Sequence, residues 1–274
     1  MSRETDVPVA TLSDWRRGNH VPREFADLLK VVRLLSERAG QGPPSIARWR
    51  QLLVASGPWP AGSVTAGELA GWAPSIVALG DRLEAAFSEP HVQIDAVCLN
   101  GQSLSLAMGR PIQAVYAETV HPERIDVRVL LPSRDINLAF PCAIELNQEG
   151  FDPVHQGWLS QRNAHGQSMR MALLSLRETH GIDVRVSFRS LPFTPMAKVY
   201  LINGKEALFS YYMVAKRTAE GDFGSVDVYD PGPRGIVRLF GMGKIEEDDI
   251  FVEQSHLWFN AIWESVSSEL KLDY

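Results

Sequence analysis

The sequence predicts an α/β protein in which an N-terminal helical segment precedes a domain built on a mixed sheet. In the first 90 residues, apolar side chains recur every three or four positions, as in amphipathic helices. After Pro90, strand-like apolar runs alternate with helical ones, which favours parallel pairing. Asn203-Gly204 then separates two apolar runs and predicts an antiparallel hairpin. The predicted domains are residues 1–90 and 91–274.

Three helices are expected in the first part. One lies between Pro22 and Gly40, and a second follows Ser45, whose hydroxyl can cap it. The third covers residues 65–86, although Pro74 interrupts its apolar stripe. This third helix either packs on its own domain or forms a dimerising connection between two domains.

The second part is expected to alternate strands and helices. Strands are predicted at residues 92–99, 125–131, 181–188, 198–202, 207–213 and 236–240, and helices at 109–120, 168–179 and 251–270. The Gly- and Gln-containing stretch that carries His155 and His165 predicts a surface loop without the spacing of metal ligands.

Composition indicates a folded protein, because 45% of the 274 residues are hydrophobic and 22% are charged. No apolar run approaches the roughly 18 residues of a membrane span, and the first ten residues include three charged ones. We therefore expect a cytoplasmic protein without membrane contact. Cys98 and Cys142 have no CxxC or Cys/His spacing, so we expect buried thiols and neither a metal nor a cofactor.

The net charge of −6 is unevenly distributed. Residues 1–50 carry nine Lys or Arg against six Asp or Glu, which gives +3, so the remaining chain carries −9. A basic N-terminal part on an acidic body is compatible with a nucleic-acid contact made by the N-terminal part.

The stretch Ala-Thr-Leu-Ser-Asp-Trp-Arg-Arg-Gly at residues 10–18, followed by Pro22, resembles the recognition helix and exit turn of the lambda-repressor-like, or XRE, helix-turn-helix family. Leu12 and Trp15 are expected to face inward, and a glycine at position 18 permits a left-handed stop. The resemblance implies DNA contacts from Thr11, Ser13, Asp14, Arg16 and Arg17.

Two helices precede the recognition helix in that family, whereas here residues 2–4 correspond at most to the end of the second. Either the chain starts late relative to its relatives, or the element serves another purpose, such as a helix packed structurally.

A second resemblance covers roughly residues 91–270. Met-Ala-Lys-Val-Tyr-Leu-Ile-Asn-Gly at 196–204, and the run at 207–213, are similar to the phospholipase D signature of His-x-Lys, four residues, Asp, then Gly-Ser-x-Asn. A Gly-Ile-Asp-Val-Arg-Val stretch precedes both, as in that superfamily. In its active members the histidine attacks phosphorus, the lysine and asparagine hold phosphate oxygens, and two signature copies meet in one cleft.

The resemblance places Met196 at the nucleophile position and Asn203 at the acidic one, while Lys198 is retained. A thioether cannot form the phospho-enzyme bond, so we expect a catalytically inactive phospholipase D-like domain. The surviving cleft is expected to bind a ligand through Met196, Lys198, Asn203, Arg189 and Tyr211.

Together these resemblances imply a cytoplasmic transcription regulator, similar to actinobacterial regulators and to the sugar-responsive TrmB family. It would bind DNA, sense a small molecule or protein partner, and form a homodimer because a single signature copy is present. A residual phosphodiesterase or nuclease acting through Lys198 is one alternative. A protein-interaction module without DNA binding is the other.

Overall fold

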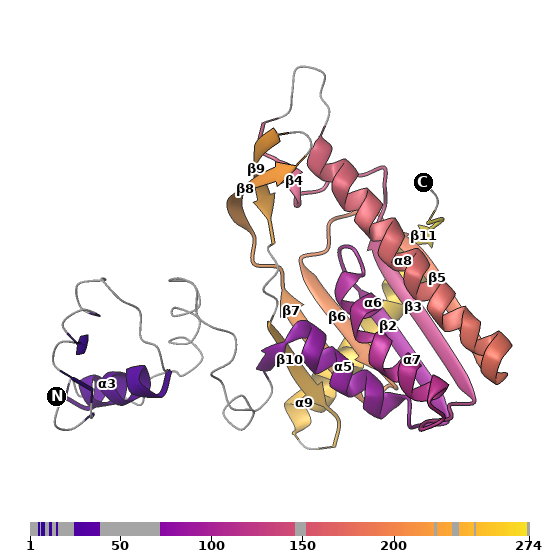
Figure 1. Ribbon diagram of the computed structural model, residues 1–274, viewed down its shortest axis with the longest axis horizontal. Helices are drawn as coiled ribbons and strands as arrows, with labels where there is room; N and C mark the ends of the chain where they lie inside the picture. Colours follow the sequence, from indigo (N-terminus) through magenta and orange to yellow (C-terminus); the bar gives the residue numbers. More distant parts are fainter. Residues whose placement is uncertain are drawn as a thin grey trace. The chain divides into compact units, whose positions relative to one another are not determined.

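The computed structural model describes residues 5, 7, 8, 11, 12, 15, 25–38, 72–145, 152–221, 224–231, 236–243 and 245–272 (Figure 1). The chain divides into two compact units, residues 1–70 and 71–274, and each is described by itself.

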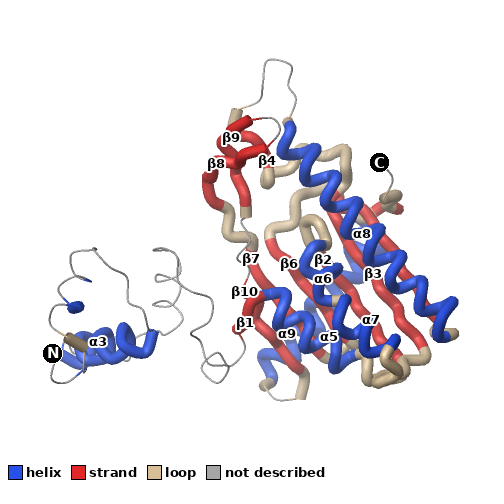
Figure 2. The backbone as a smooth tube through the Cα atoms, in the orientation of Figure 1, coloured by secondary structure: helices blue, strands red, loops and turns tan. Residues whose placement is uncertain are grey.

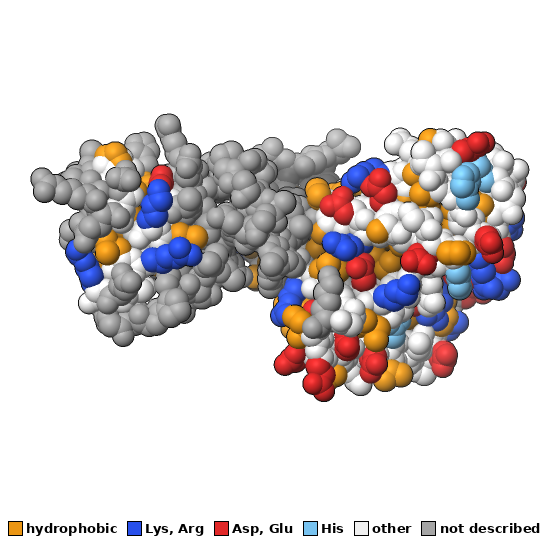
Figure 3. Space-filling view, turned by 90° about the horizontal axis from the view of Figure 1, so that it is seen from below, with side chains coloured by type: hydrophobic (Ala, Val, Ile, Leu, Met, Phe, Trp, Pro, Cys, Tyr) orange, Lys and Arg blue, Asp and Glu red, His pale blue; other side chains and the backbone are white. Residues whose placement is uncertain are grey.

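The smaller unit contains α3 (Phe25–Arg38), which confirms the helix expected between Pro22 and Gly40. Leu29, Val31 and Val32 are buried, whereas the cationic side chains of Lys30, Arg33 and Arg38 are exposed. Lys and Arg side chains are visible on the surface of this unit in Figure 3. The helix is therefore amphipathic, with a basic exposed side. The helix expected after Ser45 lies outside the described residues.

The larger unit is built on an eight-stranded sheet with the order β1-β10-β7-β6-β2-β3-β5-β11 (Figure 2). Its strands are β1 (Trp72–Pro74), β2 (His91–Val97), β3 (Arg124–Pro132), β5 (Asp183–Leu191), β6 (Ala197–Ile202), β7 (Glu206–Tyr211), β10 (Ile236–Gly241) and β11 (Ser268–Glu269). The strands β2, β3 and β5 are parallel to one another, and the remaining pairings are antiparallel. This confirms a mixed-sheet α/β domain.

Helices cover the two faces of this sheet unequally. Residues of four helices share one large apolar core with the sheet: α5 (Ser75–Ala86), α6 (Gln102–Ala107), α7 (Gly109–Tyr116) and α8 (Pro153–His180). We call this side the helix face. The opposite side, which we call the α9 face, carries α9 (Glu246–Ala261) and a smaller apolar core.

The predicted boundary at residue 90 is displaced in the structure. Residues 72–74 form β1, which pairs with β10, so the predicted helix 65–86 is wrong over these residues. Helix α5 begins directly after Pro74, because proline disfavours helical backbone in the residue before it. Leu79 and Leu83 of α5 are fully buried in the core of the sheet. Helix α5 therefore packs within the larger unit and not on the N-terminal domain of residues 1–90 to which the sequence prediction assigned it.

Helix α8 is much longer than the predicted helix at 168–179. Asp152 caps its start, since its Oδ1 accepts hydrogen bonds from the backbone N–H groups of Val154 and His155. Gly181, with φ of 69°, ends it in the left-handed conformation. His155 and His165 lie on this helix, so the predicted surface loop is wrong.

The Asn203-Gly204 hairpin is confirmed. Both residues have positive φ, 51° and 67°, and Ile202 pairs with Glu206 across the turn. A second, three-stranded antiparallel sheet is formed by β4 (Cys142–Ala143), β9 (Gly224–Asp230) and β8 (Ala215–Gly221).

The C-terminal segment is more varied than the single helix predicted at 251–270. Helix α9 continues into one π-helical turn (Ile262–Val266), after which the chain becomes extended and adds β11 to the edge of the sheet beside β5. Across the described ranges, no helix has both the length and the apolar character needed to cross a membrane.

Candidate functional site

The five residues predicted to line one cleft do not come together. Side chains alternate between the two faces along a strand. Lys198 shares the helix face with Tyr200, whereas Arg189 and Tyr211 belong to the α9 face. Asn203 lies beyond the far end of β6, roughly 16 Å from Lys198 along the strand. The prediction of one shared cleft is therefore wrong.

Two of these residues have structural contacts elsewhere in the fold. The Arg189 side chain donates to the hydroxyl of Ser267 at 2.8 Å and lies over the ring of Trp263, so it ties β5 to the C-terminal segment. The side-chain oxygen of Asn203 accepts from the backbone N–H of Gln93 at 2.8 Å. These contacts stabilise the fold.

Met196 and Tyr211 are exposed, at 63% and 66% of their surface. Met196 stands just before β6, where its carbonyl accepts a hydrogen bond from the N–H of Tyr212. The Tyr211 ring packs edge-on against Phe209.

Lys198 occupies the edge of the sheet at which the parallel strand β2 ends. Because Val199 pairs with Val97, the lysine lies beside Cys98, just past the end of β2. Its side chain is half-buried, and its ammonium group stands 5.5 Å from the ring centre of Tyr212. Burial lowers the pKa of Lys198 below its usual 10.5, because the charged form loses part of its solvation.

A continuous chain of contacts links the half-buried Lys198 to a buried cation, Arg162. The Tyr212 hydroxyl accepts a hydrogen bond from the N–H of Leu99, and the Leu99 carbonyl accepts one from the indole N–H of Trp158. The Arg162 guanidinium in turn lies 5.3 Å from the centre of the Trp158 ring.

The side chain of Arg162 is completely buried. It donates to the carbonyl of Pro132 at the end of β3 and to the side-chain oxygen of Asn163. Burial lowers its pKa to about 10, with a further lowering by Arg134. Two desolvated cations therefore lie at the edge formed by the carboxyl ends of β2 and β3, the edge where open α/β sheets bind ligands.

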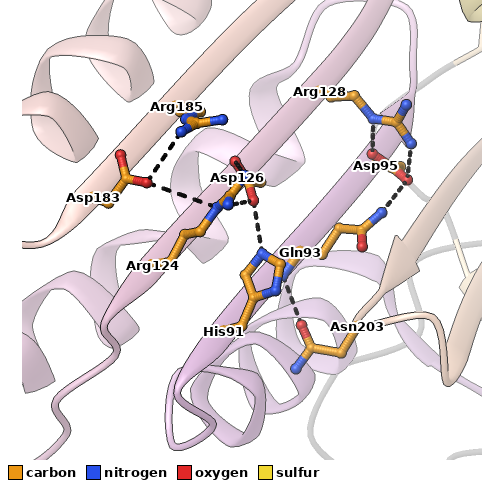
Figure 4. Close-up of polar contacts among 9 residues, drawn as sticks. All are labelled: His91, Gln93, Asp95, Arg124, Asp126, Arg128, Asp183, Arg185 and Asn203. Atoms are coloured by element: carbon orange, nitrogen blue, oxygen red, sulfur yellow. Dashed lines mark hydrogen bonds and ion pairs between the residues drawn. The ribbon is translucent and has the colours of Figure 1, made fainter.

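The α9 face carries a row of charged side chains across the parallel strands (Figure 4). Asp126 accepts hydrogen bonds from His91 at 2.7 Å and from Arg124 at 2.6 Å, and Arg124 also reaches Asp183. Burial opposes ionisation of Asp126, but these hydrogen bonds outweigh it, so its pKa lies below the usual 3.8. Most of these side chains are partly exposed, and the row follows the amino-terminal ends of the strands.

A second, buried group lies further along β2 and β3. Asp95 is fully buried and accepts two hydrogen bonds of 2.7 Å from Arg128, in a bidentate pair, and one of 3.2 Å from Gln93 (Figure 4). Arg128 also donates to the side-chain oxygen of Asn260 on α9. Nδ1 of His256 is 3.9 Å from the Asp95 carboxylate. This network joins the sheet to α9.

The sequence prediction missed both the contact chain behind Lys198 and the Asp95 network. A signal for the second was present, because polar residues alternate with apolar ones at 91, 93 and 95 and again at 124, 126 and 128. Strands with this alternation place their polar residues on one face. The contact chain left no comparable signal, since Trp158 and Arg162 belong to the unpredicted half of α8.

Of the five residues predicted to contact DNA, the structure describes Thr11, which is helical. Ser13, Asp14, Arg16 and Arg17 lie outside the described residues. Thr5 is also helical, Val7 and Pro8 are not, and helix resumes at residues 11, 12 and 15. The N–H of Leu12 donates to the carbonyl of Pro8, as in the first turn of a helix.

The two cysteines are free thiols, with Cys98 buried and Cys142 half-buried. Burial raises the pKa of Cys98 to about 12, so it is a protonated thiol at neutral pH. In the part of the chain that the structure describes, no group of three or more His, Cys, Asp or Glu is arranged to hold a metal ion.

Comparison with known proteins does not assign the chain to a family. No family model and no curated protein matches it. One solved structure that is similar is that of TrmBL2, an archaeal chromatin protein with a novel mode of DNA binding. The alignment covers 95% of this chain and 69% of TrmBL2, with 10% identity and a TM-score of 0.32. A similarity of this size carries no argument about fold or function.

Proposed function

We propose that this protein is a cytoplasmic DNA-binding regulator whose sheet domain binds a ligand without hydrolysing it. In this proposal, the N-terminal unit contacts DNA through Thr11, Ser13, Asp14, Arg16 and Arg17. The larger unit is an inactive phospholipase D-like domain that responds to a small molecule or a partner and forms a homodimer.

The observation that carries the DNA-binding proposal is the order of the described N-terminal residues. Thr5 is helical, Val7 and Pro8 are not, residues 11, 12 and 15 are helical again, and an amphipathic α3 with a basic exposed side follows. This is the order of a helix-turn-helix element, in which the second helix enters the major groove. The excess of positive charge in residues 1–50 suits a phosphate backbone.

The environment of Lys198 supports ligand binding by the larger unit. A lysine whose charged form is disfavoured by burial gains from the approach of an anion, because the anion supplies a counter-charge. Arg162 adds a second desolvated cation at the same edge of the sheet. The ligand chemistry that fits this edge is therefore a small anion, such as a carboxylate or a phosphate.

Binding to DNA is tested with the full chain and short duplexes from the DNA upstream of its own gene. The double variant Arg16→Ala/Arg17→Ala is expected to weaken binding by at least about tenfold, because two phosphate or base contacts are lost. Arg170→Ala/Arg185→Ala removes the same charge from exposed positions of the larger unit and serves as the matched control. Equal loss in both variants, or no binding at low salt, contradicts the proposal.

The residual phosphodiesterase remains the second candidate, because Lys198 is retained and half-buried. It is tested by turnover of a generic phosphodiester without added metal. We expect no turnover. Turnover that Lys198→Met abolishes would show that the domain is a phosphodiesterase and not a ligand sensor.

The proposed homodimer is tested by measuring the mass of the protein in solution by light scattering. A monomer at all concentrations contradicts that part of the proposal.

A further inference from the structure

The α9 face contains a pocket that the regulatory proposal does not use. It has a volume of about 380 Å³ and lies between α9, the Asn203-Gly204 turn and the turn after β10. Its lining consists of Gly204, Met242, Glu253, His256, Leu257 and Asn260. A volume in this range accommodates a small organic molecule.

Helix α9 supplies the polar lining on a single side. Glu253, His256 and Asn260 follow one another at intervals of three and four residues, so they project from the same side of the helix. Met242 and Leu257 provide apolar surface beside them. The pocket thus combines a polar stripe with an apolar wall, which is the usual composition of a ligand site.

The buried network behind the pocket fixes the chemistry of two of these side chains. Asn260 accepts a hydrogen bond from Arg128 through its Oδ1, which leaves its amide N–H₂ to donate. Asp95 of β2 and Arg128 of β3 act on His256, and Glu253 of its own helix shares the pocket lining with it. Burial lowers the pKa of His256, Asp95 opposes this and Arg128 adds to it, so the ring is neutral at pH 7.

A neutral imidazole has one N–H donor and one acceptor nitrogen. The Asp95 carboxylate lies on the Nδ1 side and favours the proton there, which makes Nε2 the acceptor. This Nε2 is buried and has no hydrogen-bond partner in the described ranges. An unsatisfied buried acceptor is costly and calls for a donor from outside the chain.

The charge around the pocket is negative. Asp95 and Arg128 neutralise each other in their bidentate pair, so Glu253 is the charged residue of the lining. Four further acids, Glu246, Glu247, Asp248 and Asp249, occupy the first turn of the same helix, and Asp248 among them pairs with Arg238 at 3.7 Å. Two acceptors, one of them charged, point to a ligand with several N–H donors and a positive charge.

We propose that this pocket binds a small organic cation, a primary ammonium group carried on a short apolar body. The ammonium donates to Nε2 of His256 and to the Glu253 carboxylate, and the apolar body lies against Met242 and Leu257. The proposal is independent of DNA binding and of the Lys198 edge.

The test is a calorimetric and NMR titration of the full chain with hexylamine, hexanoate and 1-hexanol, three probes of similar size and different charge. We expect saturable binding of hexylamine at neutral pH with a dissociation constant below about 10 mM. Glu253→Gln is expected to weaken it roughly threefold to tenfold. Glu247→Gln makes the same charge change on the same helix outside the pocket lining, and is expected to have less than about a twofold effect.

His256→Phe provides a second variant, because it keeps a ring of similar size and removes the unsatisfied nitrogen. We expect it to weaken hexylamine binding while the protein stays folded and at least as stable. If the histidine had only a structural role, the variant would instead lose stability and bind hexylamine as tightly as the wild type. Equal binding of hexanoate or hexanol, equal effects of the two glutamate variants, or no saturation by hexylamine would each overturn the proposal.

Discussion

The two faces of the central sheet are constructed differently. The helix face is an apolar core in which many side chains from four helices and the sheet are fully buried. The α9 face has a smaller apolar core beside a row of ion pairs and a buried Asp95–Arg128 pair. The first arrangement supplies most of the hydrophobic free energy of folding. The second contributes little net stability, because desolvation of a buried pair offsets its attraction, but it fixes the positions of polar groups.

The largest expected loss of stability comes from removing a large apolar side chain from the helix face. Leu173→Ala deletes buried methyl groups of α8 and is expected to lower the free energy of unfolding by about 3 kcal/mol. Met171→Ala on the same helix is the control, since Met171 is 73% exposed and its loss should cost less than about 0.5 kcal/mol. Denaturant unfolding measures both, and equal losses would contradict the assignment of the core.

Removing one partner of the buried Asp95–Arg128 pair on the α9 face is expected to have the next largest effect on stability. Asp95→Asn leaves the partly exposed Arg128 without its carboxylate and should cost about 2 kcal/mol, as for a buried hydrogen-bonding group left unsatisfied. The double variant Asp95→Leu/Arg128→Met removes both charges and is expected to recover most of that loss. If the double variant is less stable than the single one, the pair contributes net stability and the contrast between the faces is weaker than described.

Substitutions at two glycines of α8 test how closely other side chains pack against this helix. A Cβ at Gly166 would stand 2.7 Å from Cδ1 of the buried Leu272, so Gly166→Ala is expected to cost about 1 kcal/mol. Gly157 is exposed, and a Cβ added there would meet no atom within 4 Å, so Gly157→Ala should stabilise the helix by about 0.5 kcal/mol. Thermal unfolding distinguishes these opposite signs, and a shared sign would contradict the packing of Leu272 against α8.

The smallest expected effect is the pH dependence contributed by the α9 face. Because the folded-state pKa of His256 is lowered, the unfolded chain takes up a proton first. Its contribution to stability is therefore complete above about pH 6.5 and is lost as the pH falls below that value. Asp126 has a lowered pKa as well, so its contribution disappears only on further acidification below about pH 4.

Urea unfolding between about pH 7.5 and pH 5 compares the wild type with His256→Gln. The loss of stability in this range is expected to be smaller in the variant. An identical loss in both proteins would show that another group titrates.

The sequence predicted the elements whose apolar pattern is regular. The strands at β2, β3, β5 and β6 and the Asn203-Gly204 hairpin follow directly from alternation and turn chemistry. The first half of α8 was not predicted, because Gly157, Arg162 and Asn163 interrupt its apolar stripe. Tertiary contacts that bury Trp158 and Arg162 stabilise this half of the helix, and they leave no local pattern in the sequence.

The candidate site was less predictable than the fold. The sequence prediction placed Lys198 and Asn203 in one cleft because both match the phospholipase D signature, and it added Arg189 and Tyr211 as neighbours. In the structure, strand alternation separates these residues between two faces and two ends of the sheet. Contacts such as Trp158 with Leu99 join residues 59 positions apart, and no local pattern reports them. Sequence periodicity therefore predicts which face of the sheet a side chain occupies. The residues that meet at a site are determined by long-range packing, which periodicity does not predict.

The claim that the protein acts on DNA is tested most directly by the salt dependence of duplex binding. For the full chain, the logarithm of the binding constant is expected to fall linearly with the logarithm of salt concentration. In Arg16→Ala/Arg17→Ala the slope should be shallower by about 2, if both arginines contact phosphates. A wild-type affinity that does not change with salt, or a slope that the double variant leaves unaltered, would contradict the proposed role of the N-terminal unit.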